Sequence, residues 1–405
     1  MNTPKLRFKG FTDSWQTKKI KDIATVNQGL QIPISERFYE NSENRFFYIT
    51  NEFLKPNSKV KYFIENPPKS VLCNTEDVLM TRTGNTGHVV SNVSGAFHNN
   101  FFKINYNKSL ISRDFLTNYL RLKKTQHTIM TYAGQSTIPD LNHSDFYKIK
   151  ISYPNLKEQE KIGLFANEIE RKIKLQQEKI ELLKDQKKGY MQRIFSQELR
   201  FKDENGQSYS EWKEYKLKSI GSTFTGLSGK TKEDFGYGNH SFITYKNVFN
   251  NLFASKDGLE KVNVLENENQ AFVQKGDILL TTSSETPLEV GMASIWNHSM
   301  EKVHLNSFCF GYRLNKNENI LAEFIAISLR SDYMRKKIVL LAQGSTRFNM
   351  SKTELMLQTI MIPCVEEQLK IVNFYKSMDQ KLNLAIQQLE SLNSQKQAFM
   401  QQMFI

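Results

Sequence analysis

The feature that most constrains this 405-residue chain is an internal repeat. When the sequence is shifted by 209 positions against itself, residues 114–195 align with residues 323–404 without a gap, and 23 of the 82 aligned pairs are identical. Unrelated sequences would agree at roughly one position in sixteen, so the repeat indicates a duplication. Each copy is therefore expected to fold into the same kind of unit.

The repeat extends, with small changes of offset, into the earlier part of each half. The recurring segments are Leu6-Arg7-Phe8 with Leu199-Arg200-Phe201, Trp15 with Trp212, and residues 77–81 with residues 277–281. The middle parts of the two halves diverge most. A duplicated scaffold with dissimilar interiors predicts two modules that are held in the same way and present different surfaces. That organisation suits a protein that reads two sites.

A long helix is predicted to follow each globular module. Residues 157–197 contain no proline and only two glycines, and apolar residues recur there at spacings of three and four. The second copy has a matching pattern, and five heptads are long enough for a coiled coil. The residues assigned to the apolar seam are Ile162, Ile169, Ile173, Ile180, Leu183 and Ile194 in the first helix, and Ile371, Leu382, Leu389, Leu392 and Phe399 in the second.

Neither seam can be buried by its own helix, and the simplest partner for one is the other. Because each helix must leave one module and extend towards the other, we expect an intramolecular antiparallel pair. Lys187 and Lys396 occupy the same seam position in the two copies. They either extend their ammonium groups to solvent near a frayed end, or fix the register of the pair or dock a partner.

The predicted fold class is α+β, with two mixed α/β modules joined by two long antiparallel coiled-coil helices in an internal pseudo-two-fold repeat. The expected segments are residues 1–156 for the first module, 157–198 for the central helix, 199–365 for the second module and 366–405 for the C-terminal helix. In the first module, strands are expected at residues 45–50, 77–81 and 149–152, and one amphipathic helix at residues 113–123.

The charge of the chain favours an anionic partner. Lysine and arginine number 55 against 42 aspartates and glutamates, which gives a formal net charge of +13. Residues 1–156 alone hold 21 basic and 12 acidic side chains. Such a surplus most often serves nucleic-acid binding, through contacts to phosphates and release of counterions.

Several classes of protein are disfavoured by the sequence. No run of eighteen apolar residues occurs, and the start lacks an apolar segment after a basic one, so neither a membrane span nor export is expected. The three cysteines are widely spaced, which fits a reducing cytoplasm. The seven histidines have no ligand spacing, and no ATP-binding loop or serine-nucleophile motif is found. We therefore predict neither catalytic residues nor a metal site.

Two short motifs resemble catalytic patterns without completing them. Asn66-Pro67-Pro68-Lys69 has a lysine where the target-base loop of adenine methyltransferases has an aromatic residue, so we interpret it as a turn before a strand. Pro139-Asp140 with Glu170-Arg171-Lys172 formally matches a nuclease pattern. Its second part lies inside the predicted coiled coil, so we attribute this match to chance.

Polar loops provide the side chains that could read base edges. Arginine and lysine donate to guanine, asparagine and glutamine pair with adenine, and a carboxylate can accept from the amino group of cytosine. The candidates in the first module are Gln28, Gln31, Thr50, Asn51, Arg82, Thr83, Asn85, Gln135 and Ser136. Those in the second are Lys230, Lys232, Tyr245, Lys246, Asn247, Thr282, Ser284, Glu285 and Arg347.

Over nearly its whole length the chain resembles the specificity subunits of type I restriction-modification systems. The resemblance rests on the alternation of variable module and long helix, and on the strand and loop at residues 77–87. It also rests on the phrase Pro-x-x-x-Glu-Gln-x-x-Ile at residues 154–162 and 363–371. The loop at residues 282–285 departs from the pattern, because it lacks arginine and glycine, so the role of Arg82 is not transferred there.

The resemblance implies that each module is a target-recognition domain for one half of a split double-stranded DNA site, and that the helix pair sets the unread spacer. It also implies that two modification subunits, carrying S-adenosylmethionine, bind the helix pair, and that restriction subunits using ATP and Mg²⁺ join them. This chain itself is expected to bind no cofactor and to be non-catalytic. Because Ile405 aligns with Ser196, the chain ends are expected to lie close together.

A coiled-coil adaptor with two protein-binding heads is the alternative interpretation. The strength of DNA binding should fall steeply with added salt for a phosphate-binding reader, whereas an adaptor need not respond to salt. A fused methyltransferase or nuclease is a more distant alternative, which methyl transfer by the purified chain alone would support.

Overall fold

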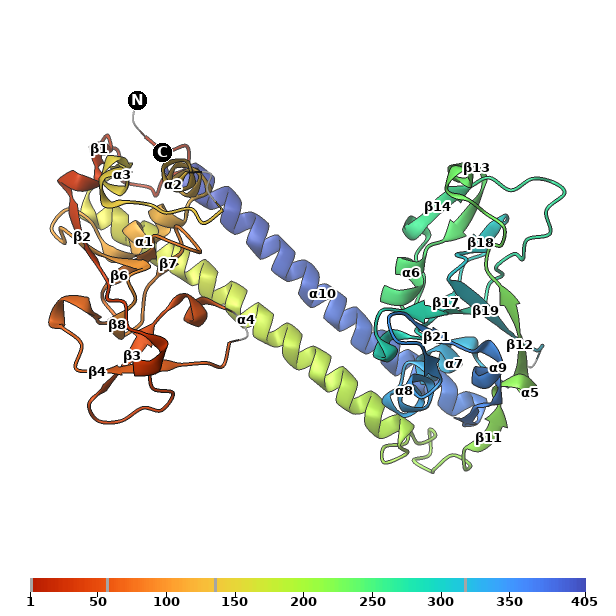
Figure 1. Cartoon of the computed structure of the whole chain (residues 1–405). Helices are drawn as coiled ribbons and strands as arrows, with labels where there is room; N and C mark the ends of the chain where they lie inside the picture. The colour runs from red at the N-terminus through yellow and green to blue at the C-terminus, as the bar shows by residue number, and fades with distance from the viewer. Residues whose placement is uncertain (1–2, 56–57, 135–136, 317–318) are drawn as a thin grey trace. The chain divides into compact units, whose positions relative to one another are not determined.

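The computed structural model describes residues 3–55, 58–134, 137–316 and 319–405. They form two compact units, one containing Met1–Glu178 and Ile386–Ile405, the other Lys179–Ala385. Each unit combines a globular module with one end of each long helix, α4 (Leu156–Phe195) and α10 (Val365–Met403) (Figure 1). Each unit therefore contains segments from both copies of the repeat.

The first module, coloured red to yellow in Figure 1, contains three sheets. An antiparallel four-stranded sheet has the order β2 (Ala24–Gln28), β9 (Phe101–Tyr106), β6 (Val78–Thr81), β7 (Val89–Val90). A mixed sheet has the order β4 (Tyr62–Glu65), β3 (Arg45–Ile49), β8 (Gly95–Phe97), β5 (Leu72–Cys73), with β3 and β8 parallel. A two-stranded sheet pairs β1 (Gln16–Lys19) with β10 (Lys150–Tyr153). Short 3-10 helices are Ile20–Asp22, Ile34–Glu36, Asn51–Leu54 and Lys69–Val71.

Three α-helices complete this module, namely α1 (Arg113–Arg121), α2 (Lys123–Ala133) and α3 (His143–Lys148). The helix expected at residues 113–123 is shorter than predicted, because Leu122 has an extended backbone (ψ 138°) and separates α1 from α2. The buried rings of Phe102, Phe115 and Phe146 contribute to the core beneath these helices. The apolar side of α1 therefore packs on the antiparallel sheet.

The second module repeats this topology. Its antiparallel sheet has the order β12 (Gly221–Thr225), β19 (Cys309–Leu314), β15 (Asp277–Thr281), β17 (Ala293–Trp296), and its mixed sheet β14 (Leu259–Val262), β13 (Phe235–Ile243), β18 (Val303–Leu305). Strands β11 (Lys213–Lys216) and β22 (Thr359–Ile362) pair, as do β16 (Ser283–Ser284), β21 (Phe348–Met350) and β20 (Ala342–Gln343). The helices are α5 (Leu217–Ile220), α6 (Tyr245–Asn250), α7 (Ala322–Leu329), α8 (Asp332–Val339) and α9 (Lys352–Leu357), with 3-10 helices at Lys232–Asp234, Lys256–Gly258 and Pro287–Glu289.

Within each unit the two long helices pack side by side and antiparallel, which confirms the prediction. Phe165 of α4 meets Phe399 of α10 edge to face, with ring centroids 5.2 Å apart, in the first unit. The equivalent pair in the second unit is Tyr190 with Phe374, at 5.3 Å. Every residue assigned to the seam is buried or half-buried. Over the ranges that the model describes, neither these helices nor the others could span a membrane.

A buried glutamate begins each long helix and ties it to the start of its module. Glu158 accepts two hydrogen bonds, of 2.7 and 2.8 Å, from the guanidinium of Arg7. Glu367 likewise accepts from Arg200, at 3.2 and 2.8 Å, and also from the indole nitrogen of Trp212, at 3.0 Å. Both carboxylates are fully buried, so these pairs explain why arginine and glutamate recur together in the two copies.

The glutamine that follows each glutamate satisfies backbone groups beside the helix start. Gln159 donates to the carbonyl oxygens of Leu110 and Pro154, each at 2.8 Å. Gln368 donates to the carbonyl oxygen of Pro363 at 2.9 Å. Both glutamines are fully buried. The repeated Glu-Gln phrase therefore fixes the junction between module and helix.

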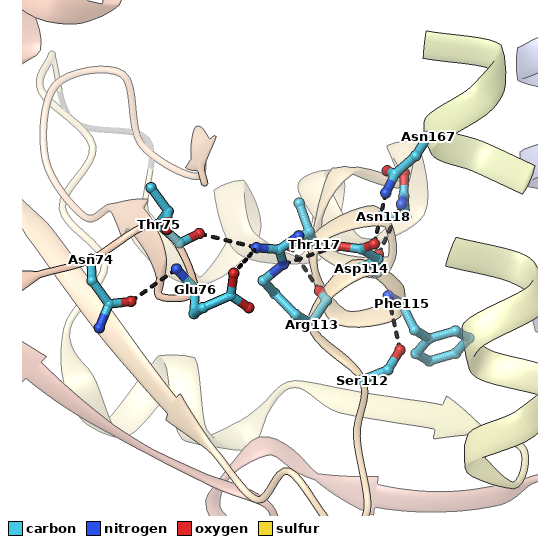
Figure 2. Close-up of polar contacts among 10 residues, drawn as sticks. All are labelled: Asn74, Thr75, Glu76, Ser112, Arg113, Asp114, Phe115, Thr117, Asn118 and Asn167. Carbon is cyan, nitrogen blue, oxygen red and sulfur yellow. Dashed lines mark hydrogen bonds and ion pairs between the residues drawn. The ribbon is translucent and has the colours of Figure 1, made fainter. Parts of the chain in front are cut away.

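Helix α1 connects the first module to α4 through a polar network (Figure 2). Arg113 donates to the carbonyl oxygen of Thr75 at 3.0 Å and lies 3.3 Å from a carboxylate oxygen of Glu76. Its neighbour Asp114 accepts from the side-chain amide of Asn167 on α4 at 2.7 Å. The network therefore connects the segment leading into β6 to the long helix through α1.

The two chain ends lie side by side, as predicted. The backbone nitrogen of Leu6 donates to the carbonyl oxygen of Gln402 at 2.9 Å. The same bond occurs inside the chain, where the nitrogen of Leu199 donates to the oxygen of Arg193 at 3.0 Å. The end of α10 therefore meets the N-terminal segment as the end of α4 meets the start of the second module.

Candidate nucleic-acid interface

The polar loops predicted to contact DNA meet at equivalent places in the two modules. Asn51, which begins the turn after β3, donates from Nδ2 to the carbonyl oxygen of Thr83 at 3.2 Å. Tyr245, which begins α6 after β13, donates from its hydroxyl to the carbonyl oxygen of Ser283 at 2.7 Å. A Cβ at Gly84 would lie 2.4 Å from Nδ2 of Asn51, so this contact requires glycine there.

The backbone around the two loops is also shared. The loop after β6 forms an antiparallel bridge with the segment before α3, and the loop after β15 forms one with the segment before α9. Each loop also accepts one backbone hydrogen bond of 2.9 Å from that segment. The bridged pairs are Thr83 with Asp140 and Ser283 with Asn349, and the bonded pairs are Leu141 with Arg82 and Met350 with Thr282. The two modules therefore present different side chains on one backbone arrangement.

We define the first cluster as Asn51, Arg82, Thr83, Thr86 and Asp140. Arg82 lies 2.6 Å from one carboxylate oxygen of Asp140, and the hydroxyl of Thr83 donates to the other. Thr86 donates to the carbonyl oxygen of Pro139 at 2.6 Å, which closes the loop against the same segment. The guanidinium of Arg82 also lies 5.7 Å from the ring centre of Phe102. Arg82 is thus held on two sides.

Asp140 was missed by the sequence analysis, which attributed Pro139-Asp140 to chance and gave it no role. The carboxylate lies 58 residues from Arg82 in the sequence, and no local pattern connects them. Only the alignment of Asp140 with Asn349, two residues after the predicted Arg347, could have drawn attention to this position.

A row of amides lies beside the first cluster. Gln28 donates to the carbonyl oxygen of Asn99 at 3.2 Å, and the amide of Asn99 donates to the side-chain oxygen of Gln31 at 2.9 Å. The side-chain oxygens of Asn51 and Asn99 and the Nε of Arg82 are buried and have no hydrogen-bond partner among the residues described. Buried polar atoms usually have a hydrogen-bond partner, so these three atoms stand out among the described residues.

The second cluster is a cavity of about 300 Å³, and it contains four of the predicted residues. The residues that line it are Tyr245, Phe249, Ser283, Ser284, Glu285, Glu289, Phe308 and Arg347. The rings of Tyr245 and Phe249 are stacked, with centroids 5.9 Å apart, and the guanidinium of Arg347 lies 5.6 Å from the ring centre of Phe308. Ser284 donates to a carboxylate oxygen of Glu289 at 3.0 Å.

The electrostatics of this cavity favour hydrogen bonding over acid-base chemistry. Burial raises the pKa of the Tyr245 hydroxyl, which therefore stays protonated and donates to Ser283. Glu285 and Arg347 are both exposed at its rim. The guanidinium of Arg347 can donate hydrogen bonds and the carboxylate of Glu285 can accept them, and the edge of a base pair offers both acceptors and donors.

Some predicted residues lie outside the clusters or have structural partners. The ammonium of Lys230 lies 2.6 Å from Glu268 and its side chain is 4% exposed; this hydrogen bond lowers the pKa of Glu268 to about 2. Asn247 is buried and donates to the carbonyl oxygen of Ser255 at 2.8 Å. Thr50 is buried as well, whereas Lys232, Lys246 and Asn85 are exposed and Thr282 is half-buried. Gln135 and Ser136 lie outside the described residues.

A metal centre has no basis in the part of the chain that the structure describes. No three side chains of histidine, cysteine, aspartate or glutamate gather there in a way that could hold an ion. The clusters therefore offer recognition chemistry, with fork-shaped donors, amides, aromatic faces and carboxylates.

A family model, the type I restriction modification DNA specificity domain, matches the chain twice, at residues 12–185 and 209–394. The specificity subunit of the type I restriction enzyme MjaVIII from Methanocaldococcus jannaschii is 23% identical over 399 residues, which cover 96% of this chain and 91% of that protein.

Two solved structures share the fold over almost the whole length. The S subunit of a type I restriction-modification system from M. genitalium has a TM-score of 0.59 and 16% identity, covering 100% of this chain and 99% of that one. A chain from a study of complex assembly and conformational transition of the type I R-M system has a TM-score of 0.57 and 15% identity, covering 95% and 96%.

Proposed function

The chain belongs to the type I restriction modification DNA specificity family, and from this premise we propose that each of its modules reads one half of a bipartite double-stranded DNA site. The observation that carries the proposal is the pair of equivalent clusters, which place different side chains on one backbone arrangement. A protein that reads two different half-sites needs a common backbone arrangement that presents different side chains to the DNA.

The chemistry of the clusters supports contacts to base edges. The first cluster offers the guanidinium of Arg82 and the amide of Asn51, and the row beside it adds the amides of Gln28 and Gln31. Asparagine and glutamine pair well with adenine. The second combines Arg347 with carboxylates and aromatic faces, which suits guanine and cytosine edges. The surplus of basic residues supplies phosphate attraction that positions the protein without selecting a sequence.

The helix pair has two tasks in this proposal. It sets the length of the unread spacer between the half-sites, and it docks two modification subunits. The exposed leucines Leu164, Leu175 and Leu182 recur on one face of α4, outside the seam, and offer an apolar stripe to a protein partner. Their removal should impair assembly without unfolding the pair.

We assign no catalysis to this chain. S-adenosylmethionine belongs to the modification subunits, and ATP and Mg²⁺ belong to restriction subunits where the host supplies them. The complex would act in the cytoplasm, where it meets duplex DNA.

The experiment that tests the proposal is methylation sequencing of host DNA with this gene present and deleted. The expected result is a split adenine-methylated motif that disappears on deletion. A motif that persists in the deletion strain would contradict the proposal. Binding of the purified complex to duplex DNA at several salt concentrations then separates a DNA reader from a protein adaptor, because only the reader must weaken steeply with salt.

A further inference from the structure

Arg82, in the loop that follows β6, forms an ion pair with Asp140. The pair is only partly exposed, with 19% of the Arg82 side chain and 47% of the Asp140 side chain accessible. The Asp140 carboxylate is itself held from two sides, by Arg82 and by the hydroxyl of Thr83. Its backbone is also fixed, because Thr83 and Asp140 form a β-bridge. Both the side chain and the backbone of Asp140 are therefore held in place by the loop that contains Arg82 and Thr83.

The guanidinium of Arg82 is held in a defined orientation by its neighbours. One terminal nitrogen of Arg82 lies on Asp140 at 2.6 Å, the ring of Phe102 lies 5.7 Å from the guanidinium, and Nε is buried without a partner among the described residues. A guanidinium fixed in this way loses less side-chain entropy when it forms two parallel hydrogen bonds to a base.

The pairing also changes the preferred ligand of the arginine. An unpaired arginine on a basic surface is attracted to any phosphate, which adds affinity without sequence information. Asp140 offsets that charge, and its half-exposed carboxylate repels a phosphate that approaches Arg82. The binding of Arg82 to DNA then depends mainly on the geometry of the hydrogen bonds that it forms with a base.

The second module lacks this arrangement. Thr282 stands at the position of Arg82 and Asn349 at the position of Asp140, while its arginine, Arg347, is exposed and lies near Phe308. The pairing is therefore a feature of one module and is not required by the shared backbone.

We propose that Asp140 is a positioning residue for base recognition, which holds Arg82 as a neutralised, directed donor so that it reads a guanine edge in the first half-site and does not bind phosphate. The inference rests on the proposed function. It adds that the half-site read by the first module contains a base pair selected through this pair of residues.

The test uses the full-length chain, in the complex in which it is purified, and a pool of duplexes with randomised positions. Selected sequences give the base preference at each position, and binding at several salt concentrations gives the salt slope. Asp140→Asn keeps the shape of the side chain and removes its charge. We expect preference at one base pair of the first half-site to fall roughly tenfold. The salt slope should steepen by about one, because Arg82 becomes free to contact a phosphate.

Two further variants keep the inference testable if Asp140→Asn folds poorly, which thermal melting will reveal. Arg82→Lys retains the ion pair without the fork, and should lose the same base preference with an unchanged salt slope. Asp140→Glu retains the charge and should restore preference at that position. The control is Asp145→Asn, which removes a half-buried carboxylate paired with Lys148 in the same module, and should leave the preference unaltered.

Different failures have different meanings. If Asp140→Asn weakened all sequences equally and relaxed no position, Asp140 would not direct Arg82. If the double variant of Arg82→Ala and Asp140→Asn lost preference at a position that Arg82→Ala keeps, Asp140 would read a base itself and the positioning role would be wrong. A wild-type complex without any preferred sequence would overturn the proposed function, and this inference with it.

Discussion

Lys187 of α4 and Asp379 of α10 form an ion pair across the helix seam, with the ammonium nitrogen 2.6 Å from a carboxylate oxygen. The residues that align with them, Lys396 and Glu170, form the same pair with the helices exchanged. The ammonium of Lys187 also lies 4.0 Å from the ring centre of Tyr375. Of the roles that the sequence left open for the two lysines, these contacts favour fixing the register, because each lysine has a carboxylate partner on the facing helix.

Removing one partner of this pair should destabilise the second unit. In Asp379→Ala the side chain of Lys187, which is 16% exposed, stays buried while its ammonium loses the carboxylate partner. We expect the free energy of unfolding to fall by about 2 kcal/mol, between the values for buried and surface pairs. Urea denaturation of Asp379→Ala, Lys187→Ala and the double variant measures the coupling. Lys184→Ala, which breaks an exposed pair with Glu181, is the control and should cost under about 1 kcal/mol.

The buried glutamate at the start of α10 should matter more. Glu367 is fully buried and accepts from both Arg200 and Trp212. Glu367→Gln leaves the Arg200 guanidinium with only the exposed carboxylate of Glu211, 3.7 Å away, as a counter-charge, and should cost about 3 kcal/mol of unfolding free energy. Denaturation curves check this, with Glu366→Gln as the matched control, because Glu366 is the exposed neighbour. An equal effect of the two changes would show that burial of the pair contributes nothing.

The meeting of the chain ends predicts that a circular permutant will fold. The backbone bond from Leu6 to Gln402 reproduces the one from Leu199 to Arg193. Joining Ile405 to Met1 and opening the chain between Gln197 and Glu198 should therefore preserve both units, with a melting temperature within a few degrees of the parent. The parent with the same cut and unjoined ends is the control. A permutant that fails to melt cooperatively would contradict the equivalence of the two junctions.

The helices and the duplication could be predicted from the sequence because both are encoded in spacing. The seam from Ile162 to Ile194 was predictable because its apolar residues recur every three or four positions. The antiparallel pairing was predictable because the repeat provides two such helices, each extending from one module towards the other. Side-chain partners in the clusters depend on the fold instead. Asp140 lies beside Arg82 because a β-bridge joins two segments that are distant in the sequence. Lys230, which the sequence predicted to contact DNA, forms an ion pair with Glu268 instead. Neither contact has a local signature.

Acid should destabilise the first module through His98. Burial, and then the guanidinium of Arg37, lower the pKa of His98 to about 4, and its Nδ1 accepts a hydrogen bond from the backbone nitrogen of Asn100. An unfolded histidine titrates near 6.5, so between these values the unfolded chain binds a proton that the folded chain excludes. The contribution of His98 to stability is therefore complete above pH 6.5 and is lost as the pH falls towards 4.

Thermal melting at pH 7 and pH 5 of wild type and His98→Gln checks this. The wild type should lose several degrees more than the variant on acidification. His127→Gln changes an exposed histidine of α2 and should behave like wild type. Identical pH responses of wild type and His98→Gln would exclude His98 as the source.

Arg347 should contribute to DNA binding in a different way from Arg82. Its guanidinium is exposed at the rim of the second cluster, and Asn349 occupies the position that Asp140 has in the first module. If Arg347 reads a guanine, Arg347→Ala should weaken binding by about 1–3 kcal/mol and relax one position of the second half-site only. If it contacts a phosphate, binding should weaken for all sequences and the salt slope should fall by about one.

Lys336→Ala, at an exposed lysine of α8, removes one positive charge of the same module and serves as the control. Binding that is unchanged in Arg347→Ala, both in sequence preference and in salt slope, would remove Arg347 from the interface and leave the cavity beside it without its principal donor.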